Sequence, residues 1–325
     1  MTPRLSLAFQ QGLTLGDRLL VVMPTPEDTL TALPEDLTVV QPFKPFHDRF
    51  RAQGFYCVPD ADGTFKDALV FVPRAKKLAR ALIHRTCQLA KDLIVVDGTK
   101  TSGIDGLLKD IRKRVDIVGP IAKAHGKIFW FQAQPDVFRD WANPAEQLVD
   151  GYHTKPGVFS ADGIDPASRL LAQALPSALG RRVADLGAGW GYLSDRILTG
   201  RETIEVLDLV EADHHALACA RLNVKDHRAA FHWSDALNWE PAEPCDTVVM
   251  NPPFHVSRAA DPEIGRGFIA TAARALKPAG QLWMVANRNL PYEATVRTLF
   301  SRVEDKGGDN RFKILHASHP SRTRR

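Results

Sequence analysis

Short apolar runs alternate with amphipathic stretches throughout the second half of the chain. Runs rich in β-branched residues predict strands at 182–186, 204–211, 229–233, 246–250, 281–286 and 312–318. Helical periodicity between them predicts helices at 191–199, 213–222, 264–276 and 292–302. Strands that alternate with helices in this way form a parallel, doubly wound sheet, the α/β fold class. Ligands of such sheets bind outside the carboxyl ends of the strands.

The first half is less regular but has the same character. Apolar runs predict strands at 19–23, 68–72, 93–97 and 127–132, and helical patterns cover 75–90 and 104–115. Residues 134–155 are rich in Pro, Asp and Trp and have no clean period, which is typical of a connection. We therefore expect one domain over 1–140, a linker over 141–155 and a second domain over 156–325.

The two halves resemble each other in sequence. ALVFVPRAK at 68–76 matches DTVVMNPPF at 246–254, and DLIVVDGTK at 92–100 matches QLWMVANRN at 281–289. KIFWF at 127–131 matches KILHA at 313–317 with similar spacing. These matches predict a tandem duplication. The first copy is degenerate, because it has no glycine-rich turn after its opening strand and has Val72-Pro73 in place of Asn251-Pro252.

The segment VADLGAGWGYLS predicts a ligand-binding turn between a strand and a helix. It contains Asp185, Gly187, Gly189 and Gly191. Glycines let the backbone turn sharply and approach a ligand closely, and the following helix N-terminus favours an anionic group. The spacing is GxGxG rather than the GxGxxG of dinucleotide binders, which favours S-adenosylmethionine (SAM) over NAD.

Two acidic residues follow the next two strands and extend this cofactor site. Glu211 ends the second strand, 20 residues after Gly191, where an acid accepts hydrogen bonds from the ribose hydroxyls of an adenosine group. Asp235, in WSDALNW, follows the third strand and is expected beside the adenine. With the glycine turn, they complete a predicted SAM site.

The tetrapeptide Asn251-Pro252-Pro253-Phe254 follows the fourth strand directly and predicts the reacting centre. A planar amino group, whose lone pair is delocalised, must be held by acceptors so that its nitrogen can attack a methyl in line. The Asn251 side-chain oxygen and the Pro252 carbonyl are such acceptors, and Phe254 can stack on the substrate plane. His255 would contact the substrate or carry its proton, or serve a purely structural role. Catalysis by positioning needs no metal and no covalent nucleophile.

Composition limits the classes of protein to consider. Hydrophobic residues make up 44% and charged residues 25%, which is ordinary for a globular protein. No apolar run reaches the ~20 residues of a membrane helix and no signal peptide is apparent, so a cytoplasmic protein is expected. The four scattered cysteines predict buried apolar side chains. The net charge is +4, with basic blocks at 68–91 and 306–325 that suggest a polyanionic partner.

These residues resemble a family within the class I SAM-dependent methyltransferases. YHTKPGVFSADGIDPASRLL, DLGAGWGYLS, NPPFH, VANRNLPYE and RFKILHA are similar to segments of the bacterial ribosomal RNA small subunit methyltransferases C, which act on guanine N2, and GTKTSGIDGLL is similar to their N-terminal part. The resemblance implies two tandem Rossmann-like domains, the first without catalytic residues. It also implies that Gly187, Gly189, Glu211 and Asp235 bind SAM, that Asn251, Pro252 and Phe254 hold the guanine amino group, and that Phe159 lies near the methionine or the base.

The sequence therefore predicts methyl transfer from SAM to N2 of a guanine in small-subunit ribosomal RNA by a monomer. The first domain would bind RNA or support folding. Other planar nitrogens stay open as substrates: a large-subunit guanine, adenine N6 or glutamine N5 of a release factor. A non-catalytic ribosomal assembly factor is the alternative of another class. Val256-Ser257 stands where the family often has Asp-Gly, and the stretch 255–265 is longer, so the target nucleotide is not specified.

Overall fold

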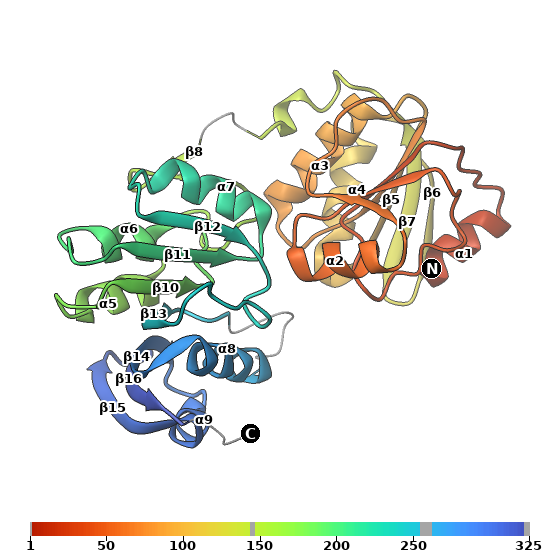
Figure 1. The fold of residues 1–325 in the computed structure, drawn as a ribbon. Coiled ribbons are helices and arrows are strands. Elements are labelled where there is room, and N and C mark those ends of the chain that lie inside the picture. Colours follow the sequence, from red (N-terminus) through yellow and green to blue (C-terminus); the bar gives the residue numbers. More distant parts are fainter. Residues whose placement is uncertain (1, 144–146, 254–261, 322–325) are drawn as a thin grey trace. The chain divides into compact units, whose positions relative to one another are not determined.

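The computed structural model describes residues 2–143, 147–253 and 262–321 (Figure 1). The chain divides into two compact units, Met1–Ala145 (unit 1) and Glu146–Arg325 (unit 2). Within the described ranges, no helix is long and apolar enough to cross a membrane. The four cysteines are buried and unbridged, as their isolated positions predict.

Unit 1 is built on a seven-stranded sheet with the order β3-β2-β1-β4-β5-β7-β6. Neighbours from β3 to β5 pair in parallel, and β7 pairs antiparallel with β5 and β6. The strands are β1 (Leu19–Val22), β2 (Leu37–Val40), β3 (Tyr56–Val58), β4 (Asp67–Phe71), β5 (Leu93–Thr99), β6 (Val118–Lys123) and β7 (Gly126–Gln132). The helices are α1 (Pro3–Gln10), α2 (Lys44–Ala52), α3 (Lys76–Leu89) and α4 (Ile104–Arg112), with a short 3₁₀ turn at Lys100–Ser102 and another at Arg139–Trp141.

Both faces of the unit 1 sheet are buried. One core joins alternate residues of the central strands, such as Leu20 and Val70, to the apolar sides of α3 and α4. The other joins the intervening residues, such as Val21 and Leu69, to α1 and α2. Because side chains of a strand point alternately to its two faces, a strand covered on both sides must be apolar throughout. This explains the continuous run Leu19–Val22, in which every residue is buried.

Unit 2 repeats the same topology. Its sheet has the order β12-β11-β10-β13-β14-β16-β15, parallel from β12 to β14 and antiparallel beyond. The strands are β10 (Arg182–Leu186), β11 (Val206–Glu211), β12 (Ala229–Trp233), β13 (Cys245–Met250), β14 (Leu276–Asn287), β15 (Phe300–Gly308) and β16 (Phe312–Pro320). The helices are α5 (Pro166–Ala174), α6 (Tyr192–Leu198), α7 (His214–Asn223), α8 (Pro262–Ala275) and α9 (Tyr292–Leu299). Helices α5, α6 and α7 share one core with the sheet, and α8 and α9 share the other.

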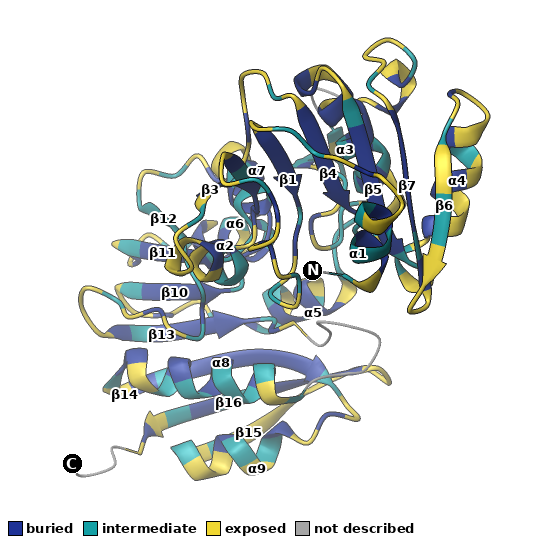
Figure 2. Ribbon diagram, turned by 90° about the vertical axis from the view of Figure 1, so that its right-hand side faces the viewer, coloured by how far each residue is buried: buried dark blue, intermediate teal, exposed yellow. Residues whose placement is uncertain are grey.

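The identical strand orders confirm the predicted fold of two tandem Rossmann-like domains. The three sequence matches between the halves align β4 with β13, β5 with β14 and β7 with β16, which hold equivalent places in the two sheets. Figure 2 shows the central strands of each unit buried between helices whose outer sides are exposed. The repetition is therefore one of three-dimensional topology as well as of sequence.

Several elements differ from the sequence expectation. The helix expected over 292–302 ends at Leu299, and strand β15 follows it. Strands β6 and β15 are mostly exposed edges without an apolar alternation, so no pattern predicts them. The short elements α1, β2, α2, β3 and α5 were also missed. Part of the expected linker forms a hairpin in unit 2, β8 (Gln147–Val149) with β9 (Tyr152–Thr154), because Tyr152 packs against the rings of Trp190 and Tyr192.

A buried ion pair fastens the first helix of unit 1 to the sheet. Arg4 in α1 donates through Nε to Asp97 Oδ1 in β5 at 2.5 Å, and the Thr2 hydroxyl donates to the other oxygen at 2.5 Å. The Arg4 side chain is 7% exposed and that of Asp97 is fully buried. Burial raises the pKa of Asp97, and the hydrogen bonds from Arg4 and Thr2 oppose this rise.

Replacing Arg4 by alanine should destabilise unit 1 selectively, because it leaves the Asp97 carboxylate buried without its cation. We expect the free energy of unfolding of unit 1 to fall by about 3–5 kcal/mol. Thiol labelling in urea can measure this by unit, since buried Cys57 and Cys87 report on unit 1 and buried Cys219 and Cys245 on unit 2. Arg18→Ala is the control, because the exposed Arg18 side chain donates a hydrogen bond to the Thr64 carbonyl at the surface. Equal labelling of Cys57 and Cys87 in Arg4→Ala and the control would contradict the prediction.

Candidate active site

The predicted site residues of unit 2 lie at the carboxyl ends of β10, β11 and β13, which the parallel pairing brings to one edge of the sheet. The glycine-rich turn leaves β10 and is fastened to the end of β11. The N–H groups of Gly187 and Ala188 both donate to the Val210 carbonyl, at 2.9 and 3.1 Å. The turn that was predicted to approach a ligand is therefore held rigidly against the neighbouring strand.

The glycines of this turn differ in the structural reason that requires them. Gly189 has a φ of +56°, and a Cβ there would meet no described atom within 4 Å, so its open side is available to a ligand. Gly191 has a φ of +91° and begins α6; a Cβ there would lie 3.0 Å from Val224 Cγ2 and 3.2 Å from the Ala220 backbone. Gly191 is thus required for close packing of α6 on α7. Gly187 also has a positive φ of +75°.

Glu211 closes the turn from the side of β11. Its carboxylate accepts from the Gly189 N–H at 2.7 Å and from the Asp213 N–H at 2.8 Å. Burial raises the pKa of Glu211 to about 7, against the lowering effect of these backbone donors. The carboxylate therefore sets the position of the Gly189 backbone and holds a charge that changes near neutral pH.

Asp185 lies deeper than the sequence suggests. It is fully buried in β10, and its Oδ2 accepts from the Ser194 hydroxyl at 2.7 Å. Its other oxygen has no hydrogen-bond partner among the described residues. Burial raises the pKa of Asp185 to about 7. The hydrogen bond from Ser194 thus connects Asp185 in β10 to α6, on either side of the glycine-rich turn.

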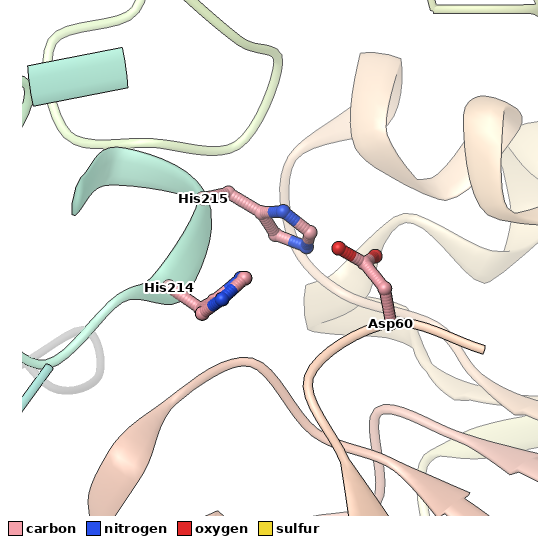
Figure 3. A group of neighbouring side chains, drawn as sticks. All are labelled: Asp60, His214 and His215. Carbon is pink, nitrogen blue, oxygen red and sulfur yellow. The ribbon is translucent and has the colours of Figure 1, made fainter. Parts of the chain in front are cut away.

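Asp235 shapes the turn after β12. Its carboxylate accepts from the Leu237 N–H at 2.9 Å and from Asn238 Nδ2 at 2.8 Å. The neighbouring Trp233 donates through Nε1 to the Ala212 carbonyl at 2.8 Å. His214, at the start of α7, packs edge-on against Trp233 with ring centroids 5.2 Å apart. Figure 3 shows His214 and the adjacent His215 at the start of α7.

Asn251 comes directly after β13 and is held by two acceptors from another segment. Its Nδ2 donates to Asp165 Oδ2 at 2.9 Å and to Ser168 Oγ at 2.8 Å. Its Oδ1 is buried and accepts no hydrogen bond from any described residue. Pro252 is buried and Pro253 is exposed. Phe254 and His255, expected to contact the substrate, lie outside the described residues.

A hollow joins the glycine turn to Asn251. It brings together Phe159, Gly187, Gly189 and Asn251 from the predicted set, whereas Asp185, Gly191, Glu211, Asp235, Pro252 and Pro253 are not among its described lining residues. Its other lining residues are Ser160 and Asp165 from the segment before α5 (residues 152–165, here called the arm), Ser168 from α5, Ala188 and Trp190 from the glycine turn, and Tyr192 and Leu193 from the start of α6. Phe159 is 57% exposed at its rim.

Sequence reasoning missed the residues that close this hollow. Trp190 in the glycine turn donates through Nε1 to the Phe159 carbonyl at 2.9 Å and so holds the arm. Asn223 donates to the His153 and Trp190 carbonyls at 2.9 and 2.7 Å and accepts from the His153 N–H at 2.7 Å. Of the residues around this hollow, the sequence signals only the start of α5, because the Asp-Pro-x-Ser pattern at 165–168 is typical of a helix N-terminus.

Within the described residues, several cations of the two basic blocks form intramolecular ion pairs. In the first, Arg80 and Lys76 pair with Asp110, and Arg85 pairs with Asp62. In the second, Lys313 is buried and pairs with Glu293 at 2.6 Å. Tyr292 is fully buried in the core of unit 2.

The doubly wound sheet and the polar groups at its carboxyl edge define a methyltransferase of the Rossmann-like type. Residues 151–316 match the family model of the methyltransferase small domain, and the chain belongs to this family. The chain is 31% identical to the ribosomal RNA large subunit methyltransferase G of Streptomyces avermitilis, over 77% of this chain and 70% of that protein. It is 29% identical to the ribosomal RNA small subunit methyltransferase C of Hahella chejuensis, over 79% and 78%.

A solved structure shares the fold of both units. The 16S rRNA N2 methyltransferase of T. thermophilus, solved in complex with AdoMet and guanosine, matches with a TM-score of 0.78 at 23% identity, covering 98% of this chain and 92% of that chain. The family match confirms the enzyme class predicted from the glycine turn and the Asn-Pro-Pro segment. The structural match confirms the tandem fold.

Replacing Asn223 by alanine should loosen the arm over the hollow, because three hydrogen bonds between the arm, α7 and the glycine turn are lost. At about 1 kcal/mol for each hydrogen bond, we expect the free energy of local opening of residues 152–165 to fall by about 1–3 kcal/mol. Backbone hydrogen exchange followed by mass spectrometry measures this. Asn238→Ala is the matched control, because Asn238 is exposed and its side chain donates to Asp235, outside the arm. Unchanged exchange of the arm in Asn223→Ala would contradict the prediction and assign the arm's stability to its other contacts, such as the hydrogen bond from Tyr152 to Asp195.

Proposed function

We propose that this protein transfers a methyl group from SAM to the N2 amino group of a guanine in ribosomal RNA, with small-subunit RNA as the first candidate. The observation that carries the proposal is the buried, unpartnered Oδ1 of Asn251 at the end of β13, beside the glycine turn. A buried acceptor without a donor costs free energy unless a ligand supplies that donor. An exocyclic amino group supplies it.

The residues present fit SAM. The open side of Gly189 permits close approach of a ligand to the backbone, and Glu211 at the end of β11 offers a carboxylate for ribose hydroxyls. Asp235 would lie by the adenine, while Gly187 supplies the turn and Asp185 and Gly191 support it from within. When bound, SAM supplies a methyl on a sulfonium, which is an activated leaving group.

The chain's own groups then act by holding the amino nitrogen. Asn251 Oδ1 and the Pro252 carbonyl would each accept one amino hydrogen, which directs the nitrogen lone pair toward the methyl. Both prolines lack an N–H that could compete for these acceptors. The proton leaves the nitrogen after transfer, so no strong general base is required. Phe254 would stack on the base, and Pro253, Phe159 and His255 would line its path. This is catalysis by orientation and fixed dipoles.

Two features support RNA as the substrate, and both rest on similarity. The relatives reported above are named for ribosomal RNA of the large or the small subunit, and the similar solved structure contains guanosine. A base within a duplex would have to leave the stack to reach the hollow. Residues 1–140 would then bind RNA or support folding, 141–155 would connect, and 156–325 would catalyse, in a cytoplasmic monomer without a metal. Large-subunit guanine is the second candidate, supported by the 31% identity to a large-subunit enzyme.

SAM affinity should rise with pH through about 7. The pKa of Glu211 is raised to about 7, so below that pH the carboxyl is protonated and must lose its proton to accept fully from the ribose hydroxyls. Linkage then weakens binding by up to about tenfold for each pH unit below the pKa. Calorimetric titration between pH 6 and 8 measures this. Glu211→Gln should bind SAM at least roughly tenfold more weakly and without this pH dependence, while Glu202→Gln, at an exposed position, should behave as wild type. A pH dependence that persists in Glu211→Gln would assign it to another group.

The reaction itself can be tested by tritium transfer from labelled SAM to purified small subunits, large subunits, free ribosomal RNA, release factor and DNA. We expect N2-methylguanosine in small-subunit RNA. Asn251→Ala should lower the rate by roughly 100-fold or more, as removal of one preorganised polar contact does in other enzymes. Asn310→Ala, at an exposed position, is the control. Label on adenine or in release factor would agree with the proposed mechanism but contradict guanine as the substrate. SAM binding without transfer to any of these substrates would favour a ribosomal assembly factor.

A further inference from the structure

We infer that Asp165, assisted by Ser168, is a positioning residue that determines which end of the Asn251 side chain faces the substrate. The inference rests on the proposed function. Asp165 and Ser168 precede the SAM-binding turn in the sequence. Neither residue has a role in binding SAM or in holding the base under the proposed function. Asp165 and Asn251 are 86 positions apart, and the fold brings them to one wall of the hollow.

Asp165 holds its place through the start of α5. It is the N-cap of that helix, and its Oδ2 accepts from the Ser168 N–H at 2.8 Å. The same oxygen accepts from Asn251 Nδ2 at 2.9 Å, and Ser168 Oγ accepts from the same nitrogen at 2.8 Å. Ser168 is buried, at 8% exposure. Two acceptors fixed on one helical turn thus bind both hydrogens of the Asn251 amide.

The chemistry of these partners fixes the orientation of the amide. The NH₂ and carbonyl ends of asparagine have almost the same shape, so packing alone does not distinguish the two orientations. An ionised carboxylate only accepts hydrogen bonds, and it therefore selects the NH₂ end. The carbonyl end must then point to the opposite side, where Oδ1 is buried and unpartnered among the described residues. A flipped amide would place two oxygens against each other and present a donor to the substrate's own donor.

A helix cap would explain part of this arrangement, and the two roles can be separated by one substitution. Asparagine caps helices about as well as aspartate does, so Asp165→Asn keeps the cap on α5. Its side-chain NH₂ can, however, donate to Asn251 Oδ1 and stabilise the flipped amide. Asp165→Asn therefore leaves the helix intact and removes the selection of one amide orientation.

The experiment measures kcat, KM for RNA and the SAM dissociation constant of the full chain. Asp165→Asn should lower kcat by roughly 10- to 100-fold, with KM for RNA and the SAM dissociation constant within about twofold of wild type and the unfolding of unit 2, followed by thiol labelling of Cys219 and Cys245, unchanged. Ser168→Ala should lower kcat less, because Asp165 still selects the orientation. Asp162→Asn is the matched control, since Asp162 is an exposed acid three positions earlier, and it should leave kcat unchanged.

A double-variant cycle separates positioning from an independent role. If Asp165 acts only through Asn251, adding Asp165→Asn to Asn251→Ala should not lower kcat further. A further loss in the Asn251→Ala background would overturn the inference and give Asp165 a role of its own, as would wild-type kcat in the single Asp165→Asn variant.

Failure of the proposed function can be told apart from failure of this inference. If wild type methylates none of the substrates, the proposed function fails, and the orientation is tested without turnover. The Asn251 side-chain NH₂ should then be protected from hydrogen exchange in wild type and lose that protection in Asp165→Asn, measured by nuclear magnetic resonance of selectively labelled protein. Equal exchange in the two proteins would overturn the inference.

Discussion

The candidate site depends on one constraint, the parallel pairing of β10 with β11 and β13, which puts their carboxyl ends at one edge of the sheet. Gly189, Glu211 and Asn251 follow three different strands and meet there only because all three strands run in the same direction. Hydrogen bonds then lock the group: Gly187 and Ala188 to the end of β11, and Glu211 back to Gly189. Chemistry at this edge needs short loops on a rigid sheet, because an error of a fraction of an ångström in a positioned amide is costly in rate.

The sequence predicted the parts of this arrangement that depend on local pattern. Buried parallel strands such as β10 and β13 are apolar throughout, and glycine spacing marks the turn, so both could be identified. Edge strands β6 and β15 could not, because exposure removes the apolar signal. Contacts between distant segments were equally hidden: no pattern joins Asp165 to Asn251, or Arg4 to Asp97 across 93 positions. The ion pairs within the basic blocks were hidden too, since the sequence shows the cations but not the acids that the fold places beside them.

The two units differ in how their buried polar side chains are partnered. In unit 1 the buried Asp97 carboxylate has a cation and a hydroxyl as partners. In unit 2 one Asp185 oxygen and the Asn251 Oδ1 are buried without a partner among the described residues, and burial raises the pKa of both Asp185 and Glu211 to about 7. Unsatisfied polar groups of this kind lower stability and cluster where a ligand is to be bound.

The separate pairs of cores in the two units affect how the stability of this chain can be described. Each sheet buries its own two faces against its own helices, so each unit contains the interactions that make a cooperative folding unit. A chain of two such units does not follow a two-state transition, and a single melting temperature is not a defined property of it. A ligand of unit 2 stabilises the unit that binds it, in proportion to the logarithm of its concentration. The unfolding temperature of unit 2 would then depend on the supply of the ligand that this unit binds.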